Sequence, residues 1–261
     1  MNAYLVTLGS LLRALLVYNV RMTVVAIALA LPVACLFAAA RLSRHWLIHA
    51  PSTAYVNVLR SSPLVMIMFW VYTVGPMITG RPNSAYLSAQ IALAAFEVAY
   101  FTEIIRTGLQ SVATGQRNAG LATGLTRYEV MRRIILPQAL RRMTPSLLTQ
   151  SLIAFQDSTI ASVISVPDVM QTTNVINARE QDPITLYATL AVLFFFVCYT
   201  FSRAIGRMEH SVRQRMGLVP LSDLRGVIGS ARSVSRGSRS PPMRAMEGVS
   251  GVVRSIWWPS C

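Results

Sequence analysis

The sequence predicts an all-α integral membrane protein with five transmembrane helices. Hydrophobic residues make up 53% of the 261 residues and charged residues 13%, whereas soluble proteins average about 45–50% and about 25%. Five stretches are nearly free of charge, and each approaches the ~20 residues that cross the hydrocarbon core as a helix. They are residues 22–40, 61–80, 82–96 with an extension to 102, 144–167 and 183–202.

The first stretch has two interpretations. Arg13 and Arg21 followed by the apolar residues 24–37 and three alanines at 38–40 resemble a cleavable signal peptide. Four further apolar stretches follow, which favours a first helix that is retained. Pro32 then kinks this helix without ending it.

Residue types exclude several kinds of chemistry. All 24 basic residues are arginine, so the chain has neither the lysine of a phosphate-binding P-loop nor a lysine for Schiff-base catalysis. Its three histidines and three cysteines lack metal-ligand spacing. We therefore predict no catalytic residue, no metal and no cofactor.

The distribution of arginine predicts the orientation of the chain, because loops on the cytoplasmic side are rich in basic residues. Ten arginines lie in the connections between spans one and two and between spans three and four, and only Arg81 and Arg179 lie in the other two connections. This places the N-terminus outside and the C-terminus inside. Arg13 and Arg21 run against the rule.

The long basic connection at residues 107–142 is too long for a simple turn and reads as short helices. Gly124 supplies a helix stop, Thr126 and Glu129 form a capping box that opens the next helix, and Pro137 is expected to break that helix. The segment either lies on anionic lipid of the inner leaflet or docks a cytoplasmic partner. Composition alone favours the lipid surface.

In this connection Asn118-Ala119-Gly120 is followed after three residues by Gly124, after nine more by Ile134, and after one more by Leu136-Pro137. This order resembles the EAA loop of ABC importer permeases, whose pattern is E-A-A-x3-G-x9-I-x-L-P. Asn118 and Gly120 depart from the pattern, which has Glu and Ala there, but every spacing matches. Residues 97–112, 135–141 and 156–159 also resemble polar amino-acid permeases, and residues 57–66 and 155–157 resemble the glutamate/aspartate permeases most. The residues at the positions of the EAA motif are Asn118, Ala119, Gly120, Gly124, Ile134, Leu136 and Pro137.

The resemblance implies a type-1 permease domain over residues 15–206 in the bacterial cytoplasmic (inner) membrane. Such a permease pairs with a second, similar or identical permease, receives an amino acid from an extracytoplasmic solute-binding protein, and binds an ATP-binding cassette ATPase dimer through the EAA loop. ATPase activity is then expected in the partner and not in this chain. Alternatives are import of another polar amino acid or small solute, and a non-transporting scaffold for a cytoplasmic protein.

Acidic and polar residues within the spans are candidates for the substrate pathway: Glu97, Asp157 and Thr159. A charge inside a span normally faces a bundle interior or a water-filled path. Asp157 either contacts the ammonium group of the substrate, directly or through a neighbour, or forms a buried pair that fixes helix packing. Glu103 is expected to pair with Arg106 three residues on. Arg60 either pairs with an acid or anchors at the headgroups, and the sequence identifies no pathway arginine for an anionic substrate.

Residues 207–261 form a tail that is rich in arginine and serine from about residue 216. This composition predicts disorder. Association with lipid of the inner leaflet explains the charge better than binding of RNA, so we predict no nucleic-acid partner.

Overall fold

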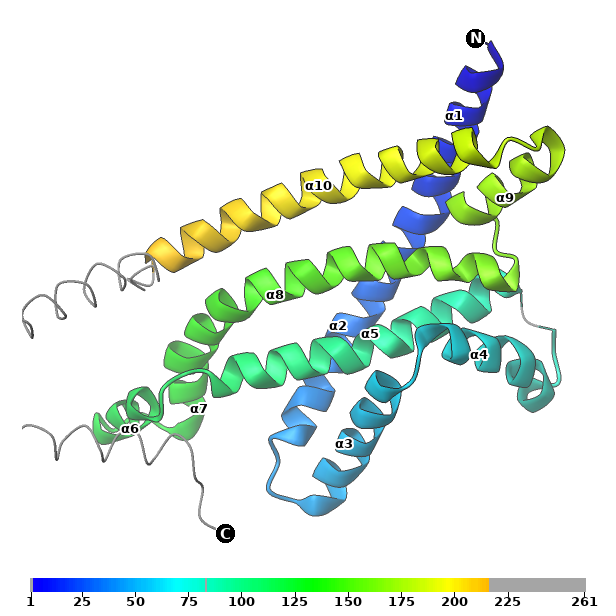
Figure 1. Ribbon diagram of the computed structural model, residues 1–261. Coiled ribbons are helices and arrows are strands. Elements are labelled where there is room, and N and C mark those ends of the chain that lie inside the picture. Colours follow the sequence, from blue (N-terminus) through cyan, green and yellow to red (C-terminus); the bar gives the residue numbers. More distant parts are fainter. Residues whose placement is uncertain (1, 83, 216–261) are drawn as a thin grey trace, which may run out of the picture. The chain divides into compact units, whose positions relative to one another are not determined.

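The computed structural model describes residues 2–82 and 84–215, and the side chains of residues 6–82 and 84–207. Helices account for all the regular structure of those residues (Figure 1). The predicted all-α class is therefore confirmed. In chain order the helices are α1 (Asn2–Ala14), the π-helix η1 (Leu15–Val20), α2 (Arg21–Arg41), α3 (Trp46–Ser61), α4 (Leu64–Thr79), α5 (Ala85–Gln110), α6 (Thr114–Ala122), α7 (Arg127–Glu129), the π-helix η2 (Val130–Ile135), α8 (Leu136–Asp157), the 3₁₀-helix η3 (Ser158–Ile164), α9 (Val169–Glu180) and α10 (Pro183–Arg215).

Three helices are long and apolar enough to cross a membrane on their own: Val6–Arg41, Ala85–Gln110 and Pro183–Arg207. The first joins α1, η1 and α2 into one helix that continues through Pro32. These helices correspond to the first, third and fifth predicted spans. The described residues thus hold three spans by length and composition, or four if α3 and α4 count together as one, against the five predicted.

The second predicted span begins at a break between two helices. α3 ends at Ser61, α4 begins at Leu64, and the pair is bent by 107°. Pro63 explains the break, because a proline holds the residue before it in an extended conformation, and Ser62 has ψ 139°. The charge pattern places residues 41–60 in a connection, but most of them form α3. Its histidines, Pro51 and Arg60 hide the helix in the sequence.

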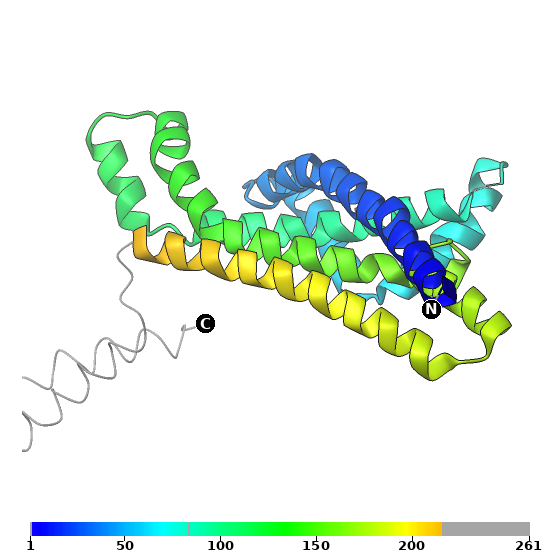
Figure 2. The ribbon, with the colours of Figure 1, turned by 90° about the horizontal axis from the view of Figure 1, so that it is seen from above.

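The fourth predicted span lies on α8 and η3, which are not among the candidate spans. α8 begins at Leu136, well before the predicted start, and carries Arg141, Arg142 and Gln150. These polar residues lower its hydropathy. α8 packs against α5, and Figures 1 and 2 show the two helices side by side.

The bundle is built around α5, which packs against α2, α3, α4 and α8. Four alanines of α2, at positions 26, 30, 34 and 38, are completely buried. Their spacing of four places them on one face of the helix. Small residues let two helix backbones approach closely in a membrane, and Ala92 and Ala99 of α5 are likewise completely buried.

Large apolar side chains are exposed on the outer faces of the bundle. Leu29 and Leu36 of α2 and Phe195 and Phe196 of α10 each expose more than half of their surface. Such exposure is costly in water but is expected where lipid tails surround the helix. The structure therefore agrees with the predicted membrane location.

α10 is joined to α8 through stacked rings, because the centroids of Phe155 and Phe194 lie 5.6 Å apart. The helix continues to Arg215, so the first nine residues of the predicted tail are helical. The remainder of that tail, residues 216–261, lies outside the described residues.

A buried polar network joins η1 to the segment that follows η3. Asn19 donates from Nδ2 to Oγ of Ser158 at 3.0 Å, and its Oδ1 accepts from the N–H of Val169 at 3.1 Å. Asp168 caps α9, with Oδ1 accepting from the N–H of Gln171 at 2.8 Å. Its Oδ2 is buried and has no hydrogen-bond partner among the described residues. Burial raises the pKa of the Asp168 carboxyl to about 6.

We expect Asp168 to lower the free energy of unfolding by about 1.4 kcal/mol between pH 5 and pH 8. A carboxyl with a higher pKa in the folded state stabilises the fold when protonated. This contribution is complete below the unfolded pKa of about 3.9 and is lost as the pH rises through the folded value. Asp168→Asn keeps a helix cap without a titrating proton, so its contribution is expected to be independent of pH. Thermal unfolding of wild type and Asp168→Asn in detergent, at pH 5 and at pH 8, measures the difference. If the stability of both proteins changed equally between the two pH values, the prediction would be contradicted.

Candidate functional site

The long basic connection folds into short helices at the end of the bundle opposite α9 (Figures 1 and 2). α6 ends at Ala122, and Gly124 adopts a φ of +84°, so the predicted helix stop is confirmed. Asn118 and Ala119 are exposed on α6, whereas Gly120 is buried. The exposed pair is therefore available to a partner, and the glycine faces the protein.

Gly120 lets α6 pack directly on the next helical segment. A Cβ atom built on it would lie 2.8 Å from Cδ1 of Ile134 and 2.9 Å from Cγ2 of Val130. Both distances are shorter than real Cβ contacts, so only glycine fits without a shift of its neighbours. Gly120 and Ile134, which the sequence motif pairs only by spacing, thus lie against each other in space.

The capping box predicted at Thr126 is confirmed. The N–H of Thr126 donates to Oε2 of Glu129 at 3.0 Å, and the N–H of Glu129 donates to Oγ1 of Thr126 at 3.3 Å. The bond from the Thr126 backbone lowers the pKa of the Glu129 carboxyl. The helix that follows Gly124 therefore has a fixed start.

Pro137 does not end this helix, contrary to the prediction. α7, the π-helix η2 and α8 follow one another without a break, and Leu136, between η2 and Pro137, is in the right-handed helical region. Pro137 lies in the first turn of α8, where the missing N–H of a proline is tolerated. The wider turns of η2 allow the change of direction that Figure 1 shows between α7 and α8. Leu136 and Pro137 are both exposed.

Contacts at its base connect this loop to the bundle. Arg142 donates from Nη1 to the carbonyl oxygen of Ser111, which joins the start of α8 to the end of α5. A Cβ atom on Gly108 would lie 2.9 Å from Cβ of Met143, so α5 and α8 are in close contact there. The base of the loop is therefore in direct contact with both helices.

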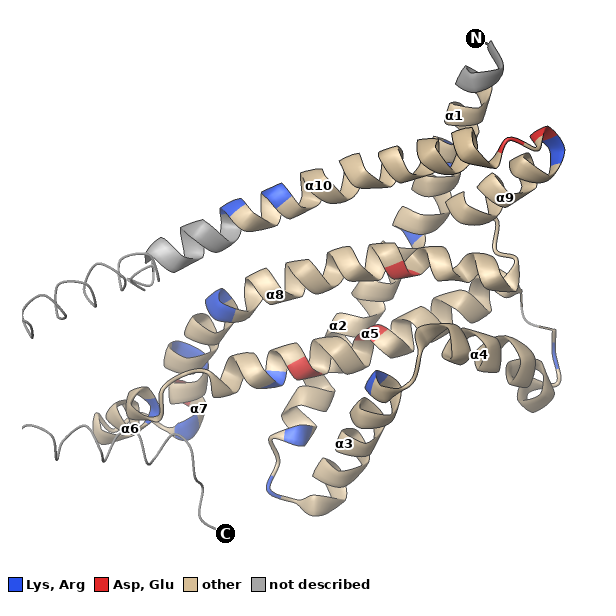
Figure 3. Ribbon diagram, viewed as in Figure 1, with Lys and Arg blue, Asp and Glu red and all other residues tan. Residues whose placement is uncertain are grey.

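A cleft of about 470 Å³ lies between α6 and the segment from Arg127 to Ile135. Its lining includes Arg117, Leu121, Arg127 and Met131. Figure 3 shows basic residues on α6, α7 and the start of α8. This end of the bundle thus offers a basic surface with an apolar floor.

The three predicted pathway residues do not form one site. Glu97 of α5 is completely buried, and both of its carboxylate oxygens accept from Nε2 of Gln150 on α8, at 3.3 and 3.2 Å. Asp157 is partly buried and lies within electrostatic range of Glu97. Thr159 instead lines a pocket of about 300 Å³ with residues of α9 and α10. Gln150, which the sequence did not single out, is the partner that holds Glu97.

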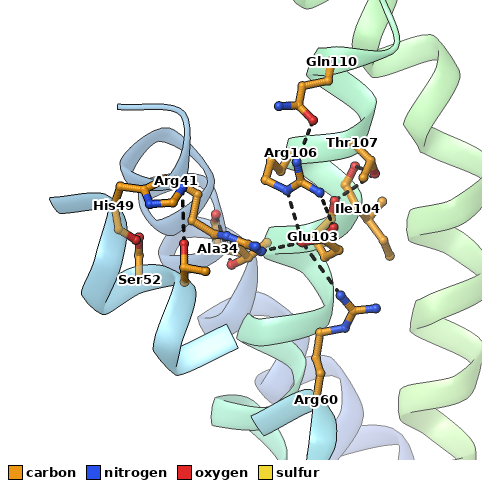
Figure 4. Close-up of polar contacts among 12 residues, drawn as sticks. Ala34, Arg41, His49, Ser52, Arg60, Glu103, Ile104, Arg106, Thr107 and Gln110 are labelled. Carbon is orange, nitrogen blue, oxygen red and sulfur yellow. Dashed lines mark hydrogen bonds and ion pairs between the residues drawn. The ribbon is translucent and has the colours of Figure 1, made fainter. Parts of the chain in front are cut away.

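A second charged group surrounds Glu103 and was only partly predicted. Arg106 bonds Glu103 as expected, and Arg41 of α2 also donates to Oε2 of the same carboxylate. Arg60 at the end of α3 reaches that oxygen at 3.8 Å. We call these four residues the arginine cluster (Figure 4). Arg41 and Arg60 lie more than 40 residues from Glu103 in the chain, so no local pattern indicates the contact.

Comparison with known proteins identifies the family and the fold. Residues 30–208 match the family described as binding-protein-dependent transport system inner membrane component. The chain belongs to this family. The glutamate/aspartate import permease protein GltK of Escherichia coli O6:H1 is 34% identical over 201 residues, which cover 74% of this permease and 90% of that protein. The probable glutamine ABC transporter permease protein GlnP of Bacillus subtilis is 37% identical over 164 residues, which cover 61% and 73%.

Solved structures agree with this membership. A crystal structure of an amino acid ABC transporter with histidines matches the permease with a TM-score of 0.76 and 26% identity, over 80% of this chain and 97% of that chain. An inward-facing MetNI methionine transporter matches with a TM-score of 0.62 and 19% identity, over 76% and 93%, which shows the fold alone. The predicted permease bundle is therefore confirmed.

Proposed function

We propose that this permease is the transmembrane subunit of an ATP-driven importer of polar amino acids, with glutamate and aspartate as its first candidate substrates. The observation that carries the proposal is the 34% identity with a glutamate/aspartate import permease over 90% of that protein. The separate ATPase, the second permease and the extracytoplasmic binding protein are the partners that such an importer requires. The N-terminus is then outside and the C-terminus inside.

The loop from α6 to η2 is the proposed docking site for the ATPase. Exposed Asn118 and Ala119 offer the contact, while Gly120 against Ile134 holds α6 on η2. Gly124 and the capping box at Thr126 fix the turn between the two helices. Closure of the ATPase dimer would push α6, and the contacts of Gly108 and Arg142 would pass that movement to α5 and α8.

Of the proposed pathway residues, Glu97 and Asp157 belong together. Glu97 is completely buried, so it would meet a solute only when α5 and α8 move apart. Such a movement of helices is expected in a transporter that works by alternating access. Thr159 lies on the side of α9 and α10 and would contact a solute near the outer end.

Glutamine is the second candidate substrate. The permease is 37% identical over 164 residues to a probable glutamine permease of Bacillus subtilis and 29% identical over 169 residues to the glutamine transport system permease protein of Escherichia coli K12. The side chain of glutamine is neutral, so its transport requires a cationic partner for the α-carboxylate alone.

Reconstitution tests the function directly. The permease is placed in liposomes with its ATPase and its binding protein, and ATP-dependent uptake of labelled glutamate, aspartate and glutamine is measured. We expect uptake of at least one acidic amino acid, and vesicles without ATP are the control. Uptake of glutamine alone would make glutamine the substrate in place of glutamate and aspartate. A complex that transports no amino acid would overturn the proposal.

A further inference from the structure

Arg60 occupies an unusual position for a charged residue. It lies one residue before the end of α3, at the 107° break between α3 and α4, a pair that forms either a broken span or a re-entrant loop. Broken helices at membrane depth are tolerated where they are buried in protein or line a water-filled cavity. The Arg60 side chain remains 40% exposed. A half-exposed cation at such a break is a candidate for contact with a passing solute.

The arginine cluster carries more positive charge than its single carboxylate balances. Three arginines surround Glu103, which gives a formal charge of +2 (Figure 4). Arg41 and Arg106 both hydrogen-bond the carboxylate. Among the described residues, Arg60 makes only an ion pair at 3.8 Å and a contact with the Tyr100 ring, 5.3 Å from its centroid. The guanidinium of Arg60 therefore retains donors for a second anion.

Arg41 has an unused donor as well. Its side chain is only 10% exposed, and its Nε is buried without a hydrogen-bond partner among the described residues. A buried donor without a partner destabilises a protein. An anion beside Glu103 would satisfy this donor, so the observation points to a ligand independently of Arg60.

The start of α4 adds a third attraction for an anion. α4 has 16 residues, and Pro63 at its N-cap position provides no side-chain hydrogen bond to the first turn. Free N–H groups at a helix start favour negative charge. In transporters, broken helices with such ends commonly face the anionic group of a substrate. Arg60 and the start of α4 lie on the two sides of the same break.

We propose that the arginine cluster at the break between α3 and α4 binds a carboxylate of the transported amino acid, with Arg60 as the direct contact. This inference rests on the proposed amino-acid import and supplies the cationic contact that the sequence did not identify. Arg41, Arg106 and Glu103 are positioning residues that hold the cluster. A phospholipid phosphate has similar chemistry, and Arg41 of the cluster is the last residue of the first span, so the test includes an arm that distinguishes lipid from the solute.

The test compares Arg60→Gln and Arg60→Lys in the reconstituted complex. Uptake of labelled glutamate is measured with saturating loaded binding protein, together with ATP hydrolysis and the melting temperature of the complex. Loss of a hydrogen-bonded charge contact is expected to reduce uptake by about tenfold or more in Arg60→Gln. Arg60→Lys keeps the positive charge but not the planar guanidinium that can donate two parallel hydrogen bonds, so we expect its uptake to fall about threefold. ATP hydrolysis and melting temperature should remain near wild type.

Arg203→Gln is the matched control. Arg203 of α10 also lies over a tyrosine ring, at 5.2 Å from the centroid of Tyr199, but is not part of the arginine cluster. We expect normal uptake in this variant. Equilibrium dialysis of labelled glutamate with the permease–ATPase complex, without binding protein, should also show binding in wild type and Arg203→Gln that Arg60→Gln lacks.

Several results would overturn the proposal. Wild-type uptake in Arg60→Gln would do so. The proposal would also fail if Arg60→Gln and Glu103→Gln lost uptake to the same extent and both lowered the melting temperature of the complex, because this would indicate a structural ion pair. If Arg60→Gln does not assemble, unchanged uptake in Arg60→Lys overturns it. A phospholipid that co-purifies with wild type but not with Arg60→Gln, at unchanged uptake, would assign the cluster to lipid. A wild-type complex that imports no amino acid overturns the proposed function itself.

Discussion

Gly124→Val is expected to abolish ATP-driven uptake while leaving membrane insertion and ATP hydrolysis intact. Gly124 has a φ of +84° between α6 and the capping box. A residue with a Cβ atom in the left-handed region is destabilised by roughly 1–2 kcal/mol, and a β-branched residue is an outlier there. The turn must therefore change its path. α6 would lose its fixed position relative to η2, and a push from the ATPase would no longer reach α5 and α8.

Two variants separate this effect from a general loss of stability. Gly115→Val adds the same side chain on α6, at a glycine with no atom within 4 Å of a built Cβ and no positive φ, so coupling should be retained. Gly124→Asn should keep much of the uptake, because asparagine tolerates the left-handed region. Uptake and ATP hydrolysis are measured in the same vesicles. A Gly124→Val complex that transports as well as wild type would show that the turn does not transmit the movement.

The features that the sequence predicts well are those set by neighbouring residues. The stop at Gly124 and the capping box of Thr126 and Glu129 depend on a few consecutive residues, and the structure confirms both. Long apolar stretches such as residues 183–202 likewise indicate a helix without knowledge of its neighbours. The prediction for Pro137 was wrong because a proline breaks a helix in its interior but is tolerated in its first turn. The π-helix η2 ends at Ile135, so Pro137 falls in the first turn of α8.

Features that depend on distant residues could not be predicted. The Arg41–Glu103 contact joins residues 62 positions apart, and Gln150 reaches Glu97 across 53 positions. Neither pair leaves a periodic pattern. The break at Pro63 was hidden for a related reason, since the apolar run begins next to it and reads as one straight span. The sequence therefore predicts the long apolar helices and the local turns, whereas the polar contacts between helices required the structure.

Gly120→Ala is expected to weaken the packing of α6 on η2 and to reduce uptake, although the motif of related permeases has alanine at this position. The new methyl group would lie 2.8 Å from Cδ1 of Ile134 and 2.9 Å from Cγ2 of Val130. Val130 is 1% exposed and, as a β-branched residue, has little rotamer freedom in a helix. Overpacking of this kind destabilises by about 1–3 kcal/mol. The chain thus uses glycine where Val130 leaves no room for alanine.

A double-mutant cycle tests that explanation. Val130→Ala removes the Cγ2 methyl group that faces Gly120, so the double variant Gly120→Ala, Val130→Ala should regain uptake relative to Gly120→Ala alone. Residues in contact show interaction energies of about 0.5–3 kcal/mol in such cycles, whereas independent sites add. Limited proteolysis of the loop between residues 113 and 126 reports detachment of α6 alongside uptake. Strictly additive effects would mean that the loss comes from elsewhere. A restored double variant would show that the residue at position 120 is set by its contact with η2, and that the departure from the motif is compensated within the loop.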